Sequence, residues 1–345
     1  MSTTRKLAHA SMLGLALGLA ACAGSGSKPA AAQFQQDITG PARPWTQKPF
    51  DNADDKFTFA VFSDLNGGER DHVFDIAVAQ LALLRPEFII GVGDLIKGSA
   101  DAGQREHEWE SFDARAGRAS APVFYVGGNH DLTGLPLQRE WDERYGRRYY
   151  WFVYKKVLFL VLDTEDNTPE RSQEIMRLRN EALEVDDTQG YEAFKQTEYA
   201  HIPELLAGNV SPEQSAYFRR VIAAHPDVRW TFLFMHKAPW ERPGERNFAA
   251  IETALADRPY TVFHGHIHTY AYQKRHGRDY IRLATTGGTQ VVGPERSMDE
   301  VALVTVSSSG VDIANLLLAG ILDKTGHVPL GGDSVCFEKA VCGEP

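Results

Sequence analysis

Short apolar runs recur along the chain from about residue 57, and each run ends in a polar or glycine-rich cluster. Several of the runs are almost entirely apolar, which is typical of strands buried on both faces of a sheet. We therefore predict six strands, at residues 56–62, 87–92, 122–126, 230–235, 260–263 and 280–284.

Helical periodicity lies between these runs. Residues 70–84 carry apolar side chains at positions that share one face of a helix. Residues 212–224 begin with Ser211, Pro212 and Gln214, a combination that supplies an N-cap, a proline at the first helical position and a capping-box glutamine. The alternation of strands and helices predicts an α/β fold.

Further strand signals indicate that the fold has two sheets. Residues 149–163 have the pattern of a hairpin with its turn near Lys155 and Lys156, and residues 300–318 have the pattern of further strand. We expect a two-sheet β-sandwich flanked by helices, within a domain at residues 53–320. The polar, partly helical segment 166–210, with helical stretches at 174–184 and 192–199, is expected to be an insertion over one edge.

The first 21 residues have the features of a signal peptide. Arg5 and Lys6 precede an apolar stretch, residues 12–19, that is too short to span a bilayer. The following Leu19-Ala20-Ala21-Cys22 resembles a bacterial lipobox, which implies cleavage before Cys22 and a lipid anchor on its thiol. Since Ala23 rather than Asp follows, we expect an outer-membrane lipoprotein facing the periplasm. The alternative is an ordinary secretory signal with a chance cysteine.

Two more segments flank the expected domain. Residues 22–52 are rich in Ala, Gly, Ser, Pro and Gln, so we expect a flexible tether. In the C-terminal tail, residues 321–345, an oxidising compartment would favour a disulfide between Cys336 and Cys342. Two free thiols in a frayed tail are the alternative.

The bulk composition excludes some classes of protein. The chain has 345 residues, 43% of them hydrophobic, and a net charge of −10, which suits an ordinary globular protein. No extended nucleic-acid surface is expected, because phosphate contacts need clustered Lys and Arg.

Six polar side chains fall at or just past the C-terminal ends of predicted strands. Ligands bind at this edge of open α/β sheets. Carboxylate, amide oxygen and imidazole suit Mn, Fe or Zn, and the lack of cysteine among the six argues against a thiolate site. The six residues are Asp64, Asp94, Asn129, His236, His266 and His268.

Each of these side chains also has a plainer explanation. Asp64 and Asp94 could cap the segments that follow them, and His236 could be a core histidine with satisfied hydrogen bonds. The presence of six such residues at one predicted edge favours metal ligation over these separate explanations.

Four sequence strings resemble the motifs of the calcineurin-like metallophosphoesterases in order and spacing. They are Gly93-Asp94, Gly128-Asn129-His130-Asp131, His236 and Gly265-His266-Ile267-His268. The resemblance covers about residues 57–310. It implies hydrolysis of a small phosphate mono- or diester by a metal-bridging hydroxide, with two divalent or trivalent metal ions (Mn, Fe or Zn) as cofactors.

The resemblance places Asp94 between the two metal ions, where its carboxylate would bridge them. Asp64 and His268 would complete what we call the first metal site. The family has Asp-x-His where this chain has Asp64-Leu65-Asn66, so Asn66 offers only a neutral amide oxygen as a weak fourth ligand. This departure implies weaker binding or a harder ion such as Mn or Mg. It leaves open an alternative function, a non-catalytic phosphate- or metal-binding lipoprotein.

The resemblance also implies a second metal site and a catalytic pair. The second metal site would consist of four residues: Asp94, Asn129, His236 and His266. His130 would stand beside the phosphate, where it would protonate the leaving group or stabilise charge on the transferring group. Asp131 would orient the His130 ring.

The residues around these motifs have simpler expected roles. We expect Lys97 and Lys237 to be solvated rather than bound to substrate, and His264 to serve packing or to support a ligand. The segment 285–288 is predicted to be a tight turn, with substrate contact as the less favoured role. The aromatic residues Trp240, Tyr270 and Tyr272 are expected in the core more than in a pocket.

Overall fold

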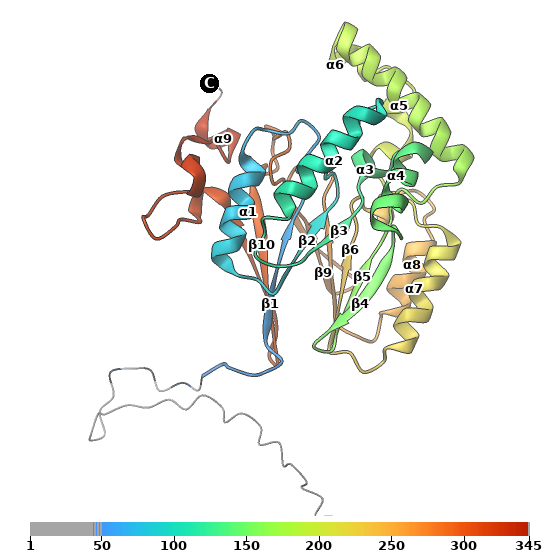
Figure 1. Ribbon diagram of the computed structural model, residues 1–345. Helices are drawn as coiled ribbons and strands as arrows, with labels where there is room; N and C mark the ends of the chain where they lie inside the picture. Colours follow the sequence, from blue (N-terminus) through green and yellow to red (C-terminus); the bar gives the residue numbers. More distant parts are fainter. Residues whose placement is uncertain (1–43, 45, 47, 49, 344–345) are drawn as a thin grey trace, which may run out of the picture. The chain divides into compact units, whose positions relative to one another are not determined.

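The computed structural model describes residues 44, 46, 48 and 50–343 (Figure 1). The predicted signal peptide at 1–21, the predicted lipid-bearing Cys22 and most of the expected tether lie outside the described residues. One compact unit begins at Asn52, and the description below concerns that unit. Among the described residues, no helix combines the length and apolar character needed to cross a bilayer.

The unit contains two sheets of mixed strand direction, as the sequence predicted. The five-stranded sheet has the order β11-β10-β1-β2-β3, in which β1, β2 and β3 run parallel. Its strands are β1 (Phe57–Phe62), β2 (Phe88–Val92), β3 (Val123–Val126), β10 (Glu300–Ser307) and β11 (Gly310–Leu317).

The six-stranded sheet has the order β4-β5-β6-β7-β9-β8, in which β5, β6, β7 and β9 run parallel. The predicted hairpin is present as β4 and β5, and its turn residues Lys155 and Lys156 both have positive φ. The strands are β4 (Tyr150–Tyr154), β5 (Val157–Val161), β6 (Trp230–Phe234), β7 (Tyr260–His264), β8 (Ala271–Arg275) and β9 (Arg278–Arg282).

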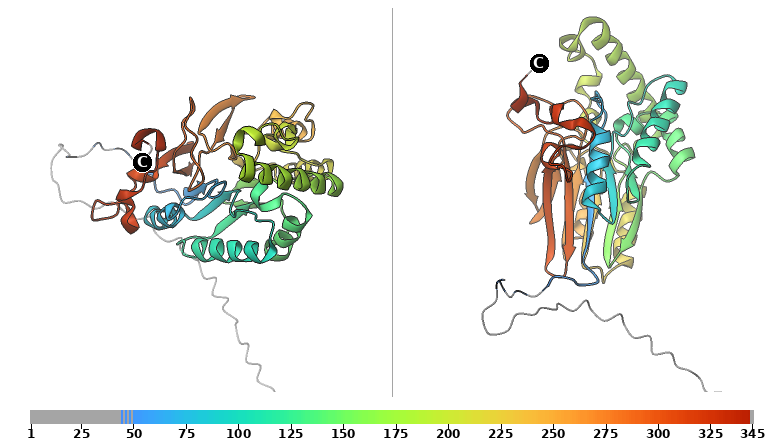
Figure 2. Two further views of the ribbon diagram at one scale, coloured as in Figure 1. Left: turned by 90° about the horizontal axis from the view of Figure 1, so that it is seen from above. Right: turned by 60° about the vertical axis from the view of Figure 1, so that its left-hand side comes forward.

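Three apolar cores hold four layers together. Side chains from both sheets form the central core. Helices α1 (Val73–Leu84) and α2 (Ala102–Ala116) cover the five-stranded sheet, whereas α7 (Pro212–Ala224) and α8 (Asn247–Ala254) cover the six-stranded sheet (Figure 2). The fold is therefore the predicted helix-flanked pair of sheets.

One helix boundary and one capping interaction differ from the predictions. Helix α1 begins at Val73 rather than at residue 70. Ser211 caps α7 by accepting a hydrogen bond from the Gln214 N–H at 3.1 Å, but the Gln214 side chain donates to the Asp163 carbonyl and does not complete the capping box. The remaining short helices are α3 (Asn129–Leu132), α4 (Leu135–Tyr145), η3 (Pro239–Glu241), η4 (Leu318–Gly320), η5 (Pro329–Ser334) and α9 (Lys339–Cys342).

The segment 166–210 is more helical than predicted. Its main element is the 21-residue helix α5 (Pro169–Gln189), which begins after the N-cap Thr168. It packs with α6 (Tyr191–Phe194), η1 (Tyr199–His201) and η2 (Pro203–Leu205) around a small apolar core of its own. We call residues 166–210 the insertion.

The C-terminal tail lies against the loop that follows β9. Cys336 and Cys342 form a disulfide. The Phe337 carbonyl accepts hydrogen bonds from Gln290 and from the backbone N–H of Asp299. The tail is therefore tied to a loop, residues 283–299, that approaches the candidate site described next.

Candidate metal centre

The six predicted ligands lie in loops that leave the C-terminal ends of parallel strands. Asp64 follows β1, Asp94 follows β2 and Asn129 follows β3, while His236 follows β6 and the two remaining histidines follow β7. The backbone binds these loops to one another: Asp64 N–H donates to the Gly93 carbonyl, and Gly265 N–H to the His236 carbonyl. The parallel edges of both sheets thus converge on one place.

Four of the predicted ligands have left-handed backbone conformations. The φ angles are 52° at Asp64, 54° at Asp94, 79° at His266 and 57° at His268. A non-glycine residue in this region costs about 1–3 kcal/mol, and such residues cluster at functional sites because the surrounding structure holds them in place. The strain here coincides with the residues that the sequence selected as ligands.

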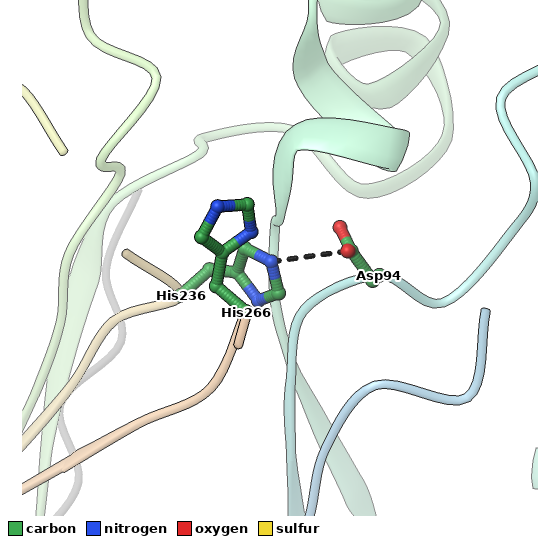
Figure 3. A group of neighbouring side chains, drawn as sticks. All are labelled: Asp94, His236 and His266. Atoms are coloured by element: carbon green, nitrogen blue, oxygen red, sulfur yellow. Dashed lines mark ion pairs between the residues drawn. The ribbon is translucent and has the colours of Figure 1, made fainter. Parts of the chain in front are cut away.

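The side chains form two groups that share one residue. Asp94, His236 and His266 bring potential ligand atoms within 4.8 Å of one another, and Asp64, Asp94 and His268 do the same. Figure 3 shows the first of these groups, in which two imidazole rings and the Asp94 carboxylate converge from separate segments. The shared Asp94 is the residue predicted to bridge two ions; the ligand assignment itself remains a prediction.

The second metal site has the donor atoms that a metal ion needs. His236 Nε2 lies 3.1 Å from Asp94 Oδ2, and the His236 and His266 ring centroids are 5.2 Å apart. Asn129 Oδ1 is buried and has no hydrogen-bond partner among the described residues, and His236 Nε2 has none there apart from its ion pair with Asp94. Buried polar atoms without partners are unfavourable, so Asn129 Oδ1 fits a metal ion well.

The first metal site is less complete. His268 Nε2 lies 3.4 Å from Asp64 Oδ1. Asn66 is buried nearby, but its Nδ2 donates to the Leu95 carbonyl at 3.2 Å and to the Glu69 carboxylate at 3.5 Å. These bonds occupy the amide nitrogen and leave Oδ1, the only Asn66 atom that could ligate a metal ion, as a neutral and weaker donor than an imidazole.

Backbone carbonyls fix the tautomer of each predicted histidine ligand. A carbonyl only accepts, so the nitrogen facing it carries the proton and the other nitrogen is left for a metal. His236 Nδ1 donates to the Val92 carbonyl, and His268 Nδ1 donates to the Thr289 carbonyl. His266 is reversed: its Nε2 donates to the Leu205 carbonyl of the insertion at 2.7 Å, which leaves Nδ1 for the metal.

Opposing charges dominate the electrostatics of the metal-free centre. Burial raises the pKa of Asp94, but the neighbouring His236 and His130 outweigh burial and hold this pKa well below its usual range. Burial lowers the pKa of His236, yet Asp94 and Asp64 raise it to about 9. The pKa of His266 is lowered well below its usual range by burial and by Lys237. In the metal-free centre these shifts favour an ionised Asp94 carboxylate beside a protonated His236 ring.

Two glycines of the motifs allow the loops to approach so closely. A Cβ at Gly128 would lie 2.3 Å from Asp94 Oδ1, and a Cβ at Gly265 would lie 2.2 Å from Asp64 Oδ2. Real Cβ atoms do not approach so near, so a side chain at either position would displace a predicted ligand. These glycines explain why the motifs contain Gly beside the ligand residues.

His130 faces the centre, but Asp131 does not orient it. The Asp131 carboxylate accepts backbone N–H groups of Leu95, Ile96 and Gly128. His130 Nδ1 instead donates to the Lys97 carbonyl at 2.7 Å, which leaves Nε2 at 4.0 Å from Asp94 Oδ2. The predicted role of Asp131 as orienting partner was wrong, because its short side chain is occupied in closing the loop around α3.

Lys237 is the clearest error among the neighbouring residues. It is buried, with Nζ 2.8 Å from Glu165 Oε1 and a hydrogen bond to the Glu204 carbonyl, whereas we expected a solvated lysine. Lys97 is exposed, as expected. Lys237 ties the strand end that carries His236 to the insertion that holds His266.

Other predictions about the surroundings can be compared directly with the structure. His264 is buried against Trp240, and burial together with the charge of Arg282 lowers its pKa to about 3, which fits a packing role.

Thr285 Oγ1 and the Gly288 N–H both donate to the Asp64 carbonyl at 2.9 Å. The loop 285–288 therefore supports the strained backbone of a predicted ligand, a role that the turn prediction missed.

A cavity of about 590 Å³ opens beside the centre, between the ligand loops and the insertion. Gly67, Lys97 and His130 line its inner part, and residues of α5 line the other side. Arg179 is one of the α5 residues that line the cavity. It belongs to no motif, so it was not predicted from the sequence as a site residue.

Structural comparisons found similar chains at low identity. A dimetal phosphatase from Danio rerio is 16% identical over 76% of this chain and 98% of that chain, with a TM-score of 0.49. GAP50, described as the anchor in the inner membrane complex of Plasmodium, is 12% identical over 79% and 87%, with a TM-score of 0.46.

A third similar structure is a purple acid phosphatase from yellow lupin seeds. It is 10% identical over 77% of this chain and 52% of that chain, with a TM-score of 0.48. Likeness at this level does not bear on activity. No match was found among curated proteins.

The family assignment comes from the sequence. A family model for the calcineurin-like phosphoesterases matches residues 57–270. This range contains β1 to β7 and every predicted ligand, and it agrees with the motifs from which the resemblance was drawn. The chain belongs to the calcineurin-like phosphoesterase family.

Proposed function

We propose that the protein hydrolyses phosphate mono- or diesters with two metal ions bound at the converging strand ends. The observation that carries this proposal is the pair of ligand groups that share Asp94. The Asn129 Oδ1 atom, which has no hydrogen-bond partner among the described residues, and the carbonyl contacts of the histidine rings support it. The nitrogen and oxygen donor set suits Mn, Fe or Zn.

In this proposal the protein positions the substrate and moves one proton. Bound metal ions supply positive charge for the phosphate and lower the pKa of water. The attacking water gives up one proton as its oxygen bonds to phosphorus, the bond from phosphorus to the leaving oxygen breaks, and the leaving oxygen takes up one proton, so the protons balance. His130 Nε2, held toward the centre by the Lys97 carbonyl, is the ring atom that holds or releases a proton there.

Metal loading and substrate turnover test the proposal together. The full chain is loaded with Mn²⁺, Fe²⁺ or Zn²⁺, its metal content is measured, and it is assayed with para-nitrophenyl phosphate and the bis(para-nitrophenyl) ester. We expect about two metal ions per chain and turnover of at least one ester. Full metal loading without turnover of either ester would contradict the enzymatic function.

Asn66 offers only an amide oxygen where the family pattern has an imidazole, and this departure is the basis of one alternative, a binding protein with an incomplete first metal site. Elemental analysis separates the two, because the alternative predicts one metal ion or none. Under the enzymatic proposal, Asn66→His raises first-site affinity by about tenfold or more, since an imidazole is the stronger ligand. First-site occupancy that is already full in the unsubstituted chain would remove the reason for this alternative.

We also propose export to the periplasm and a lipid anchor on Cys22 that holds the protein at the outer membrane. The lipobox-like sequence supports the anchor, and the disulfide between Cys336 and Cys342 suits an oxidising compartment. Incorporation of labelled fatty acid into the full chain, and its loss in Cys22→Ala, would be the expected result. Labelling that survives the substitution argues against this anchor.

A further inference from the structure

The cavity beside the metal centre is the place where a substrate would lie, and the insertion forms one of its walls. Gly67, Lys97 and His130 come from the motif loops, whereas Arg179, Glu184 and Asp187 come from α5. The cavity volume of about 590 Å³ is large enough for a small ester. Substrate selection therefore depends on what α5 presents to it.

Arg179 differs from the other arginines of α5. Arg171 pairs with Glu174 and Glu204, and Arg177 pairs with Glu181. Arg179 is only 8% exposed, yet it forms no hydrogen bond or ion pair with any residue that the structure describes. Because Arg179 lines the cavity, its guanidinium donors are available there to a ligand.

The position of Arg179 identifies the kind of ligand. It lines the same cavity as His130, whose ring faces Asp94. A guanidinium matches the oxygen pair of a phosphate bidentately. Lys97 lines the same cavity and adds a second positive charge. The inner end of the cavity is therefore cationic even before metal ions are counted.

The outer part of the cavity has the opposite charge. Glu184 and Asp187 lie on the cavity side of α5, and both are exposed. These carboxylates accept hydrogen bonds and repel anions. A bound ester would thus keep its phosphate at Arg179 and direct its leaving group toward two carboxylates.

On this basis we propose that Arg179 is the phosphate-binding residue of the substrate cleft and that the substrate is the phosphomonoester of a polar alcohol without negative charge. This inference rests on the proposed hydrolase function. A monoester leaves a peripheral oxygen free for Arg179, whereas a diester would place its second ester group there. Hydroxyl or ammonium donors on the leaving group would bind Glu184 and Asp187.

Inorganic phosphate tests Arg179 without any need for turnover. Phosphate affinity of the metal-loaded full chain is measured by calorimetry for the unsubstituted protein, Arg179→Met and Arg179→Lys. Arg177→Met, which changes an exposed arginine of the same helix, is the matched control. We expect Arg179→Met to weaken phosphate binding by about tenfold to a hundredfold. Arg179→Lys should weaken it less, because lysine keeps the positive charge but cannot donate two parallel hydrogen bonds as a guanidinium does. The control should change nothing.

Turnover then tests the class of substrate. We expect glycerol 3-phosphate and phosphoethanolamine to be hydrolysed with higher kcat/KM than 3-phosphoglycerate, which adds a carboxylate to a similar skeleton. The double substitution Glu184→Gln with Asp187→Asn should reduce this preference, whereas Glu181→Gln, on an acid paired with Arg177, should preserve it. Arg179→Met should lower kcat/KM for monoesters more than for the bis(para-nitrophenyl) ester.

The outcomes separate this inference from the function on which it rests. Turnover by the unsubstituted chain, with phosphate affinity unchanged in Arg179→Met, overturns the inference and leaves the hydrolase function intact. Phosphate binding that depends on Arg179, without turnover of any ester, supports the role of Arg179 and contradicts the hydrolase function. Neither binding nor turnover in the metal-loaded protein overturns both. Equal metal content in all variants shows that each has folded.

Discussion

The two predicted metal sites share Asp94, but different parts of the chain hold them. The second metal site is built from strand ends: His236 follows β6 directly and is fully buried, and Asn129 begins α3. His266 is fixed by the insertion through the Leu205 carbonyl. The second site therefore depends on the sheets and on one nearby contact.

The first metal site depends on more remote segments. The Asp64 carbonyl is held by Thr285 and Gly288, and His268 donates to the Thr289 carbonyl. This loop is held in turn by Arg70, which donates to the Gly288 carbonyl and to the Cys336 carbonyl of the tail.

The Asn66 departure affects the same first site. An Asn side chain supplies a weaker ligand than the imidazole of the family pattern. We therefore expect substitutions and solution conditions to change ion occupancy at the first site more easily than at the second site. The ligands of the second site are held mainly by the strands of the two sheets.

The largest effect is expected where the two sites meet. Asp94→Asn removes the carboxylate charge from both sites, so we expect loss of both metal ions and a decrease in turnover of about a thousandfold or more. Metal content and kcat measure this. Asp71→Asn, an exposed acid next to the same loops, is the control. Retention of one tightly bound ion in Asp94→Asn would show that the sites are not joined through this residue.

Separate substitutions then distinguish the sites. After dialysis, His268→Ala should retain about one metal ion per chain, because the second site is intact. His236→Ala should retain less than one, because the remaining first site is weak. Loss of a single imidazole ligand lowers affinity by about a hundredfold in this reasoning. The opposite order of retention would reverse the assignment of the stronger site.

The positions of the strand ends and of the expected ligands could be predicted from the sequence alone. The strand ends and the six ligand positions followed from apolar runs that stop at polar residues, because parallel strands in a sheet bring their C-terminal ends to one edge. Both sheets and the flanking helices α1 and α7 were also predicted from this local periodicity, whereas α2 and α8 were not. The site could be predicted because its residues lie just past apolar runs that indicate strands.

The errors concern contacts between distant segments. Lys237 looked like a solvated lysine, since nothing local indicates that Glu165 and the Glu204 carbonyl surround it. Asp131 follows His130 directly, yet its carboxylate points to the backbone of the loop after β2. Arg179 lies on a helix rich in charged residues, and only the fold shows that, among the described residues, no side chain or carbonyl pairs with it. Tertiary packing, not local sequence, decides such side chains.

The pH dependence of stability in the metal-free protein compares a histidine of the second metal site, His236, with one of the first, His268. The pKa of His236 is raised to about 9 in the folded state from an ordinary value of 6.5. Below pH 6.5 His236 is protonated in both the folded and the unfolded chain, and the stabilisation from its raised pKa is fully present. As the pH rises from 6.5 toward 9, the unfolded chain loses the His236 proton before the folded chain does. The free energy of unfolding therefore falls by at most about 1.4 kcal/mol per pH unit. The pKa of His268 is also raised, so it contributes with the same sign.

Denaturant unfolding with and without chelator measures this dependence. The metal-loaded protein should lack the His236 contribution, because a ligating nitrogen is already deprotonated. His236→Gln should remove most of the slope from the metal-free protein, whereas His268→Gln should remove less. A metal-free protein whose stability is constant from pH 6.5 to 9 would contradict the charged His236–Asp94 pair.

The smallest expected effect comes from the tail, and it tests the remote support of the first metal site. Replacing both Cys336 and Cys342 by Ser opens a bridge with a sequence separation of 6, which lowers the free energy of unfolding by about 2 kcal/mol on the chain-entropy model. The tail would then hold Arg70 and Gln290 less firmly, and through them the loop that carries the Thr289 carbonyl. We expect first-site affinity to fall by roughly threefold, a small fraction of the effect of removing a ligand or its direct partner. Second-site affinity serves as the internal control, because its supports lie in β2, β6 and the insertion. Equal weakening of both sites would mean that the disulfide stabilises the unit as a whole, and the division between core-held and loop-held sites would not stand.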